Sequence, residues 1–170
     1  MRKPNFSADW PKSWQISFSY DREEVFDEIQ TLGYAYAYSN RFNATIELVT
    51  RYTPKGARIL DVAAAQGNFT LALAELDYDV TWNDLRGDLA DYVRLKHEKG
   101  KVTYAPGDVF SLGFEGIFDC VLITEIIEHV AHPDRFLTKV ARMVKPGGHV
   151  VMTTPNGAYC MNRLPRFSEG

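Results

Sequence analysis

The pattern of hydrophobic and polar positions changes near Gly56. Before it, apolar residues recur at helical spacing over 21–32 and about 40–52, while residues 1–20 are aromatic, contain proline and show no period. This pattern predicts an extended N-terminal arm, a first helix that ends at Gly33, and a second helix that leads to the main domain. Together these segments would form a helical cap.

After Gly56, short apolar runs alternate with amphipathic stretches. The runs predict buried strands over 58–63, 78–82, 101–104, 118–123 and 149–153. The amphipathic stretches predict helices over 69–76, 88–97 and 133–144. Strands that alternate with helices pair in parallel through right-handed crossovers. We therefore predict an α/β fold with a doubly wound, mostly parallel Rossmann-like sheet in the order 3-2-1-4-5.

Small or acidic residues follow the first three expected strands. Residues 61–68 form the turn from the first strand into a helix, Asp84 lies at the end of the second strand, and Asp108 comes after the third. Small residues at the carboxyl ends of such strands let a ligand approach the backbone closely. A carboxylate at Asp84 suits two ribose hydroxyls, and one at Asp108 suits an adenine amino group. The alternative roles are packing for the small residues, a helix N-cap for Asp84 and a turn for Asp108. Because all three features occur at successive strand ends, a nucleotide-like ligand is favoured.

These positions lie in segments with a recognisable order: ILDVAAAQGNF, VTWNDL, APGDVF, FDCVLITEIIEHV and LTKVARMVKPGGHVVMTTPN. In that order and spacing, residues 58–156 resemble the class I S-adenosylmethionine-dependent methyltransferases of the ubiquinone-biosynthesis O-methyltransferase type. The most specific part is FDCVLITEIIEHV followed by VKPGG. The resemblance implies S-adenosyl-L-methionine as the cofactor, S-adenosyl-L-homocysteine as its product, and methyl transfer to a small-molecule acceptor, foremost to oxygen.

The resemblance also implies the cofactor-binding residues, which lie at the strand ends and in the second helix: Asp61, Ala63, Ala65, Gly67, Asn68, Asp84, Leu85, Asp108, Val109, Thr124 and Arg41. The loop after the first strand would wrap the methionine portion, Asp84 would bind the ribose, and Asp108 with Val109 would bind the adenine. Thr124 would face the methionine and the sulfonium through its backbone carbonyl. Arg41, or the tyrosines that precede it, would close over the cofactor.

The loop departs from the family pattern at two positions. Ala63 and Ala65 stand where glycine is usual, whereas Gly67 is kept. A methyl group at Ala65 could crowd the ligand, and it would be strained if the residue needed a positive φ. A binding module that has lost turnover is therefore the alternative to an active enzyme.

The stretch after the fourth strand holds the candidate catalytic residue. Glu125, Glu128 and His129 have a spacing that would place them on one helical face. His129 could act as the general base for a hydroxyl acceptor, because an imidazole titrates near neutral pH. Orienting the loop is the equally weighted alternative for Glu128 and His129. We expect no metal, because the small-RNA 2′-O-methyltransferases add a further histidine after the fifth strand, and His132 and His149 do not take that place.

Composition limits the partners. The 170 residues, 45% hydrophobic and 24% charged, fit one globular domain. A net charge of −3 gives no overall footprint for nucleic acid or anionic membrane, and no apolar stretch has the length of a membrane span. Cys120 and Cys160 lie far apart and have no metal-like spacing, so a scaffold of disulfide bonds is not expected. Without such a scaffold, the cytoplasm is the expected compartment. The lack of a GxGxxG loop argues against a nicotinamide oxidoreductase.

The expected organisation has three parts. Residues 1–54 would form the arm and cap helices, 55–157 the cofactor-binding core, and 158–170 the start of a truncated substrate-side segment. Such folds normally add a sixth and a seventh strand, which we expect to be missing here. The open edge of the fifth strand could then pair with a second copy of the chain.

Overall fold

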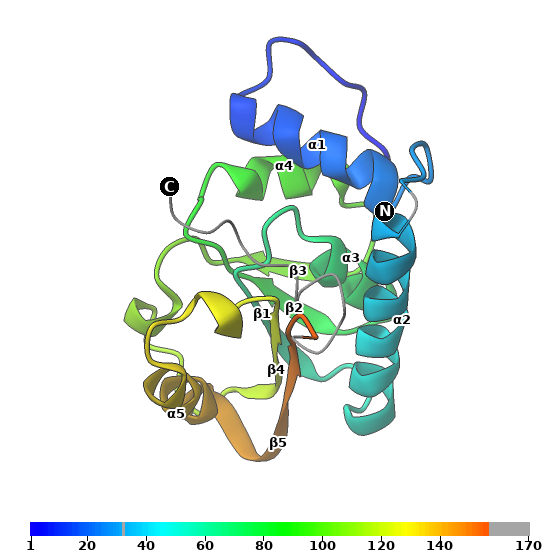
Figure 1. Ribbon diagram of the computed structural model, residues 1–170. Helices are drawn as coiled ribbons and strands as arrows, with labels where there is room; N and C mark the ends of the chain where they lie inside the picture. Colours follow the sequence, from blue (N-terminus) through cyan, green and yellow to red (C-terminus); the bar gives the residue numbers. More distant parts are fainter. Residues whose placement is uncertain (32, 157–170) are drawn as a thin grey trace, which may run out of the picture.

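A parallel sheet of five strands forms the centre of the protein, and helices pack on both of its faces (Figure 1). The computed structural model describes residues 1–31 and 33–156. Its strands are β1 (Arg58–Val62), β2 (Asp79–Trp82), β3 (Lys101–Tyr104), β4 (Phe118–Thr124) and β5 (Val144–Thr153). They follow the order β3-β2-β1-β4-β5 and every neighbouring pair is parallel, which confirms the predicted topology.

Helices cover the sheet on both sides. The described residues form α1 (Lys12–Glu24), α2 (Tyr34–Tyr52), α3 (Asn68–Glu75), α4 (Leu89–Lys96), α5 (Pro133–Met143) and the short 3-10 helices η1 (Val109–Ser111) and η2 (Ile127–His129). The core cluster on one face contains side chains of α2 and α3, and α4 extends this layer, while α5 packs on the other face. Burial on both faces explains why β1 and β4 are nearly continuous apolar runs.

Side chains of β1 alternate between these two layers. Ile59 packs in the same cluster as Val49 of α2 and Leu73 of α3. Leu60 joins the other cluster, which contains Val140 of α5. A shift of one residue would exchange the two faces, so this alternation fixes the strand register and the direction of the residues that follow.

The N-terminal region differs from the prediction. α1 spans Lys12–Glu24, so the predicted arm is limited to residues 1–11 and the helix predicted over 21–32 begins earlier and ends at residue 24. The cause is an aromatic cluster in which Trp10 and Trp14 pack edge-on against each other and both contact Tyr92 of α4. Because large aromatic side chains contribute much of their stabilisation through burial, tertiary packing selects a helix here that the local pattern does not reveal.

α2 begins earlier than predicted. It starts at Tyr34 rather than near residue 40, and Gly33 precedes it instead of ending a preceding helix. Gly33 has a φ of 97°, a conformation that glycine adopts without steric cost. This turn lets α1 contact both α2 and α4, as the ribbon shows (Figure 1).

β5 is longer than predicted, because the turn expected over 145–148 is part of the strand. The pairing of β4 with β5 shifts register between Phe118 and Cys120, as at a β-bulge. Gly148 is needed at this bulge, since a Cβ atom there would lie 2.7 Å from the carbonyl oxygen of Asp119.

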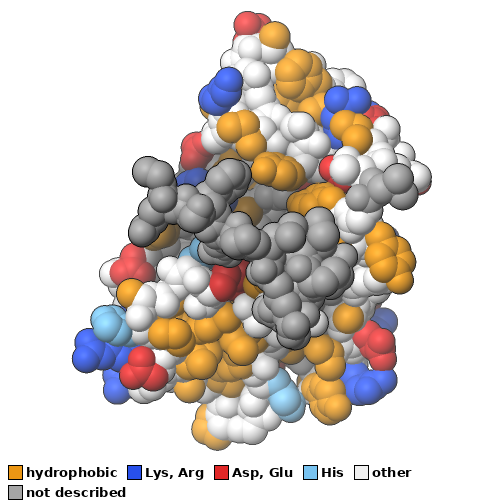
Figure 2. Space-filling model, viewed as in Figure 1, with side chains coloured by type: hydrophobic (Ala, Val, Ile, Leu, Met, Phe, Trp, Pro, Cys, Tyr) orange, Lys and Arg blue, Asp and Glu red, His pale blue; other side chains and the backbone are white. Residues whose placement is uncertain are grey.

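Among the described residues, β5 pairs only with β4. Val150 and Met152 of β5 are exposed, and hydrophobic side chains gather on the part of the surface where α5 and β5 lie (Figure 2). Pairing of this edge with a second copy stays a prediction. The segment 158–170 and Cys160 lie outside the described residues. No helix in the described part of the chain combines the length and apolar character of a membrane span.

Candidate functional site

The loop after β1 passes through three residues in the left-handed conformation. The φ angle is 50° at Ala63, 47° at Ala65 and 73° at Gly67. A Cβ atom at Gly67 would lie 2.8 Å from both Cγ atoms of Val93, so this position requires glycine. The Trp82 indole N–H donates to the Ala65 carbonyl at 3.1 Å and holds the loop against the sheet. The two alanines thus adopt a glycine-like backbone, with strain of about 1–2 kcal/mol each.

Asp84 joins this loop to the one after β2. Its carboxylate is almost fully buried and accepts hydrogen bonds from the backbone N–H of Ala65 and of Arg86, each at 2.8 Å. The N-cap of α4 is Asp88, so the alternative that Asp84 caps this helix is wrong. The Arg86 side chain donates to the same carboxylate, from Nε to Oδ1 at 3.2 Å and from Nη2 to Oδ2 at 3.5 Å.

Asp61 is buried near the carboxyl end of β1, just before the loop. Its Oδ2 accepts from the Thr70 hydroxyl of α3 at 2.6 Å, while its Oδ1 is buried and finds no hydrogen-bond partner in residues 1–31 and 33–156. Desolvation raises the pKa of the Asp61 carboxyl from an ordinary 3.8 to about 7. Asp61 therefore links α3 to β1 through a hydrogen bond. Its carboxyl group changes between the protonated and the ionised form in the neutral pH range.

This shift predicts a pH-dependent effect of Asp61→Asn. Between pH 4 and pH 7 the folded protein holds a proton that the unfolded chain releases, so stability falls as pH rises. The wild-type free energy of unfolding should fall relative to that of the variant, by at most about 1.4 kcal/mol per pH unit. Urea unfolding at pH 5, 6, 7 and 8 measures this difference. Parallel curves for the two proteins would show that Asp61 does not titrate in this range.

A cavity of about 230 Å³ opens between this loop, the two N-terminal helices and the end of β4. Its lining residues are Glu24, Tyr38, Arg41, Ala63, Ala64, Ala65, Gln66, Asn68, Phe69, Thr124 and Glu125. The structure thus brings together five of the predicted cofactor-binding residues: Ala63, Ala65, Asn68, Thr124 and Arg41. Glu24 was not predicted, because it lies on α1, where the sequence pattern misplaces the helix.

Arg41 is the cation of this cavity. Its Nη1 lies 3.2 Å from Oε2 of Glu125, and its guanidinium carbon lies 5.2 Å from the centre of the Tyr38 ring. The Nε–H is buried and has no hydrogen-bond partner among the described residues. A guanidinium with an unused donor suits a carboxylate, which can accept two hydrogen bonds from it. Tyr34 and Tyr36, the other tyrosines considered for this role, do not line the cavity.

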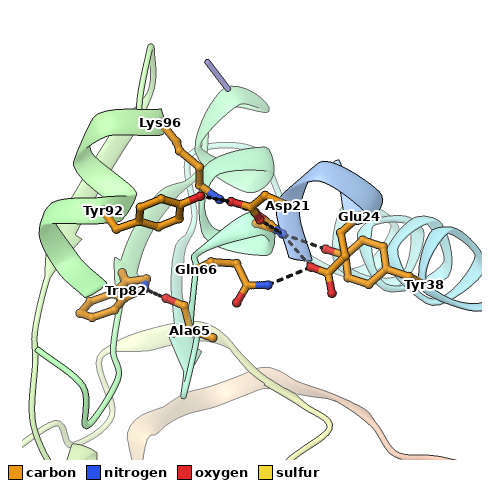
Figure 3. A network of polar contacts seen from close by, with 9 residues as sticks. Asp21, Glu24, Tyr38, Ala65, Gln66, Trp82, Tyr92 and Lys96 are labelled. Atoms are coloured by element: carbon orange, nitrogen blue, oxygen red, sulfur yellow. Dashed lines mark hydrogen bonds and ion pairs between the residues drawn. The ribbon is translucent and has the colours of Figure 1, made fainter. Parts of the chain in front are cut away.

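A buried polar network supports the cavity from behind (Figure 3). Lys96 of α4 and Asp21 of α1 are both fully buried, and their Nζ and Oδ2 atoms lie 2.7 Å apart. Lys96 also donates to the Asn68 side-chain oxygen at 2.6 Å, and the Tyr92 hydroxyl donates to Asp21 at 2.7 Å. Since Asn68 also donates to Asp21 at 2.9 Å, α1 and α4 are both tied to this first residue of α3 at the wall of the cavity.

The predicted adenine-binding residues lie outside the cavity lining. Asp108 is exposed and caps η1 by accepting from the Phe110 N–H at 3.1 Å, which agrees with its alternative role in a turn. Val109 is buried in the core, whereas Leu85 is exposed. The backbone links this region to the cavity, since the N–H of Gly107 donates to the carbonyl of Asp84 at 2.9 Å.

The stretch after β4 does not form the helical face that its spacing predicts. Glu125 has a φ of 54°, and the short η2 follows it, so the three residues do not share one helical face, although His129 Nε2 lies 4.0 Å from Oε1 of Glu128. Glu125 accepts from the Thr153 hydroxyl at 2.9 Å and Glu128 from the Thr154 hydroxyl at 3.3 Å. The His129 side chain is 79% exposed and does not line the cavity. Within residues 1–31 and 33–156, no cluster of three or more His, Cys, Asp or Glu side chains is arranged so that it could hold a metal ion.

The chain is similar to known proteins over the region just described. The methyltransferase domain family matches residues 60–152. The ubiquinone biosynthesis O-methyltransferase of Xanthomonas axonopodis pv. citri is 37% identical over 110 residues, which are 62% of this chain and 46% of that enzyme. The chain therefore matches about half the length of this curated relative.

Solved structures share the fold. A protein from Pyrococcus horikoshii OT3 superposes with a TM-score of 0.67 at 21% identity, over 94% of this chain and 73% of that one. Phosphoethanolamine N-methyltransferase 2 of Haemonchus contortus, in complex with S-adenosyl-L-methionine, gives a TM-score of 0.57 at 28% identity, over 66% and 28% of the two chains. With the family match over more than half of its length, this chain belongs to the methyltransferase domain family, the class I S-adenosylmethionine-dependent methyltransferases.

Proposed function

We propose that the cavity binds S-adenosyl-L-methionine and that the chain transfers its methyl group to an oxygen of a small molecule. One observation carries this proposal: a left-handed loop borders a cavity that Arg41 also lines. The guanidinium would bind the carboxylate of the methionine portion. Asp84 would accept from the ribose hydroxyls, and Asp108, Val109 and Leu85 would surround the adenine.

The chain's contribution to the reaction would be mainly alignment. When bound, the cofactor supplies an activated methyl on its sulfonium. Thr124, at the end of β4, would hold the methionine portion through its backbone carbonyl, and the loop after β1 would fix its direction. Holding the acceptor oxygen in line with the methyl removes much of the entropic barrier. His129 would take the proton of the acceptor hydroxyl as general base.

A module that binds the cofactor without turnover is the second candidate. Its supporting observation is the position of His129, which is exposed and outside the cavity lining. Assays with labelled S-adenosyl-L-methionine and a panel of small phenols separate the two candidates. Methyl transfer to any phenol supports the enzyme, whereas binding without transfer to any of them favours the module.

We assign residues 55–157 to the cofactor-binding core and residues 1–54 to its cap. We place the protein in the cytoplasm.

Calorimetric titration tests the binding half of the proposal. We expect S-adenosyl-L-methionine and S-adenosyl-L-homocysteine to bind at one site per chain, and NAD not to bind. NAD is the control because it shares the adenosine but lacks the amino acid portion that Arg41 would recognise. Binding of NAD alone would instead support a nicotinamide oxidoreductase.

Ala65→Gly should keep or raise the affinity for S-adenosyl-L-homocysteine. The glycine removes a methyl from the cavity lining and relieves the strain of a residue at a φ of 47°. Relief of the left-handed strain contributes about 1–2 kcal/mol, whereas the greater backbone entropy of glycine in the unfolded chain costs about 0.5–1 kcal/mol. The free energy of unfolding should therefore stay equal or rise by about 0.5–1 kcal/mol. Calorimetry and urea unfolding measure both effects. Weaker binding at unchanged stability would show that the loop is built around the alanine.

A further inference from the structure

Glu24 is an acidic residue of the cavity that no part of the proposed function uses. It comes from the last turn of α1 and reaches the cavity wall (Figure 3). Its Oε1 accepts from the Tyr34 hydroxyl at 2.6 Å, and its Oε2 accepts from the side-chain amides of Gln66 at 2.9 Å and Asn68 at 3.1 Å. In the part of the chain that the structure describes, no ion pair involves Glu24. Three neutral donors thus orient this carboxylate, and among the described residues Arg41 attracts it without forming an ion pair with it.

The network behind Glu24 makes this orientation firm. Lys96 can only donate, so the oxygen of the Asn68 amide must face it. The NH₂ group of Asn68 then points to the carboxylates of Asp21 and Glu24. Since Lys96 and Asp21 are fully buried, they hold the Asn68 amide in this direction. Glu24 is therefore presented to the cavity by a rigid support.

The charges of the cavity are complementary to an amino acid zwitterion. Arg41 lines the cavity and is paired there with Glu125, and a guanidinium has five N–H donors, so it can hold a second carboxylate. Glu24 adds a second carboxylate, so the three charges sum to −1, opposite to the charge of S-adenosyl-L-methionine. We propose that Glu24 accepts a hydrogen bond from the α-ammonium group of the methionine portion, while Arg41 binds its carboxylate. This inference rests on the proposed function and names the residue that selects the amino acid portion.

Desolvation supports this assignment. Burial raises the pKa of the Glu24 carboxyl, and the nearby Asp21 raises it further. An ammonium group at this position would offset both effects by stabilising the ionised carboxylate. A ligand that lacks the ammonium would leave them in place.

The test compares two ligands in three proteins. Calorimetry measures the affinities of S-adenosyl-L-homocysteine and of its analogue in which hydrogen replaces the α-amino group. The proteins are the wild type, Glu24→Gln, and Glu47→Gln as a matched control on the exposed side of α2. The ratio of the two affinities within each protein cancels any general loosening of the site, and thermal unfolding confirms that each variant is folded.

We expect the wild type and Glu47→Gln to prefer S-adenosyl-L-homocysteine by about tenfold or more, the usual range for a hydrogen bond between charged groups. Glu24→Gln should reduce this preference to less than about threefold. An unchanged preference in Glu24→Gln, with S-adenosyl-L-homocysteine still bound, overturns the role of Glu24 and leaves the proposed function standing. Failure of the wild type to bind S-adenosyl-L-homocysteine overturns the proposed function itself.

Discussion

Replacing Lys96 with methionine should lower the free energy of unfolding by about 3–5 kcal/mol, the usual loss when one partner of a buried ion pair is removed. The ammonium of Lys96 is fully buried and bonds to both Asp21 and Asn68. Methionine keeps most of the volume but leaves the Asp21 carboxylate buried without its cation. Urea unfolding measures the change.

Lys101→Met is the matched control, because Lys101 pairs with Asp79 on the surface and an exposed pair contributes less than about 1 kcal/mol. The double variant Asp21→Asn, Lys96→Met removes both charges and should recover part of the lost stability. If Lys96→Met unfolds like Lys101→Met, the network does not hold α1 and α4 together as we describe.

Asp84→Ala should weaken the binding of S-adenosyl-L-homocysteine by roughly 10- to 150-fold, which corresponds to about 1.5–3 kcal/mol. The variant loses the carboxylate that would accept from the ribose hydroxyls. It also leaves the N–H of Ala65 without its acceptor, so the loop that borders the cavity becomes less fixed. Calorimetry decides the magnitude.

Two controls separate these effects. Asp84→Asn keeps an oxygen for the N–H of Ala65 but removes the charge, so it should bind more tightly than Asp84→Ala and more weakly than the wild type. Asp79→Ala changes an aspartate at the other end of β2 and should bind like the wild type. Unchanged affinity in Asp84→Ala would limit Asp84 to joining the two loops.

The sheet could be predicted from the sequence because its signals are local. Each strand is a short apolar run bounded by punctuating residues, and burial on both faces makes such runs continuous. The first helix could not be predicted in the same way. α1 is fixed by contacts of Trp10 and Trp14 with Tyr92, more than seventy residues later, and by the ion pair of Asp21 with Lys96. Such long-range contacts leave no period in the local pattern.

The residues of the site also differ in whether local sequence signals could place them. Ala63, Ala65 and Thr124 could be placed because they lie at or just beyond the carboxyl ends of predicted strands, and such ends of parallel strands meet at one edge of the sheet. Glu24 could not, since its position depends on α1. The helical face expected for Glu125 and His129 failed because the backbone turns left-handed at Glu125, which residue spacing alone does not reveal.

A crystal structure of the chain with S-adenosyl-L-homocysteine tests the central claim most directly. We predict that the amino acid portion lies over the loop after β1, with its carboxylate within hydrogen-bond distance of the Arg41 guanidinium. The ribose hydroxyls should then lie within hydrogen-bond distance of the Asp84 carboxylate. A ligand bound away from the ends of β1 and β2, or no bound ligand at saturating concentration, would contradict the account.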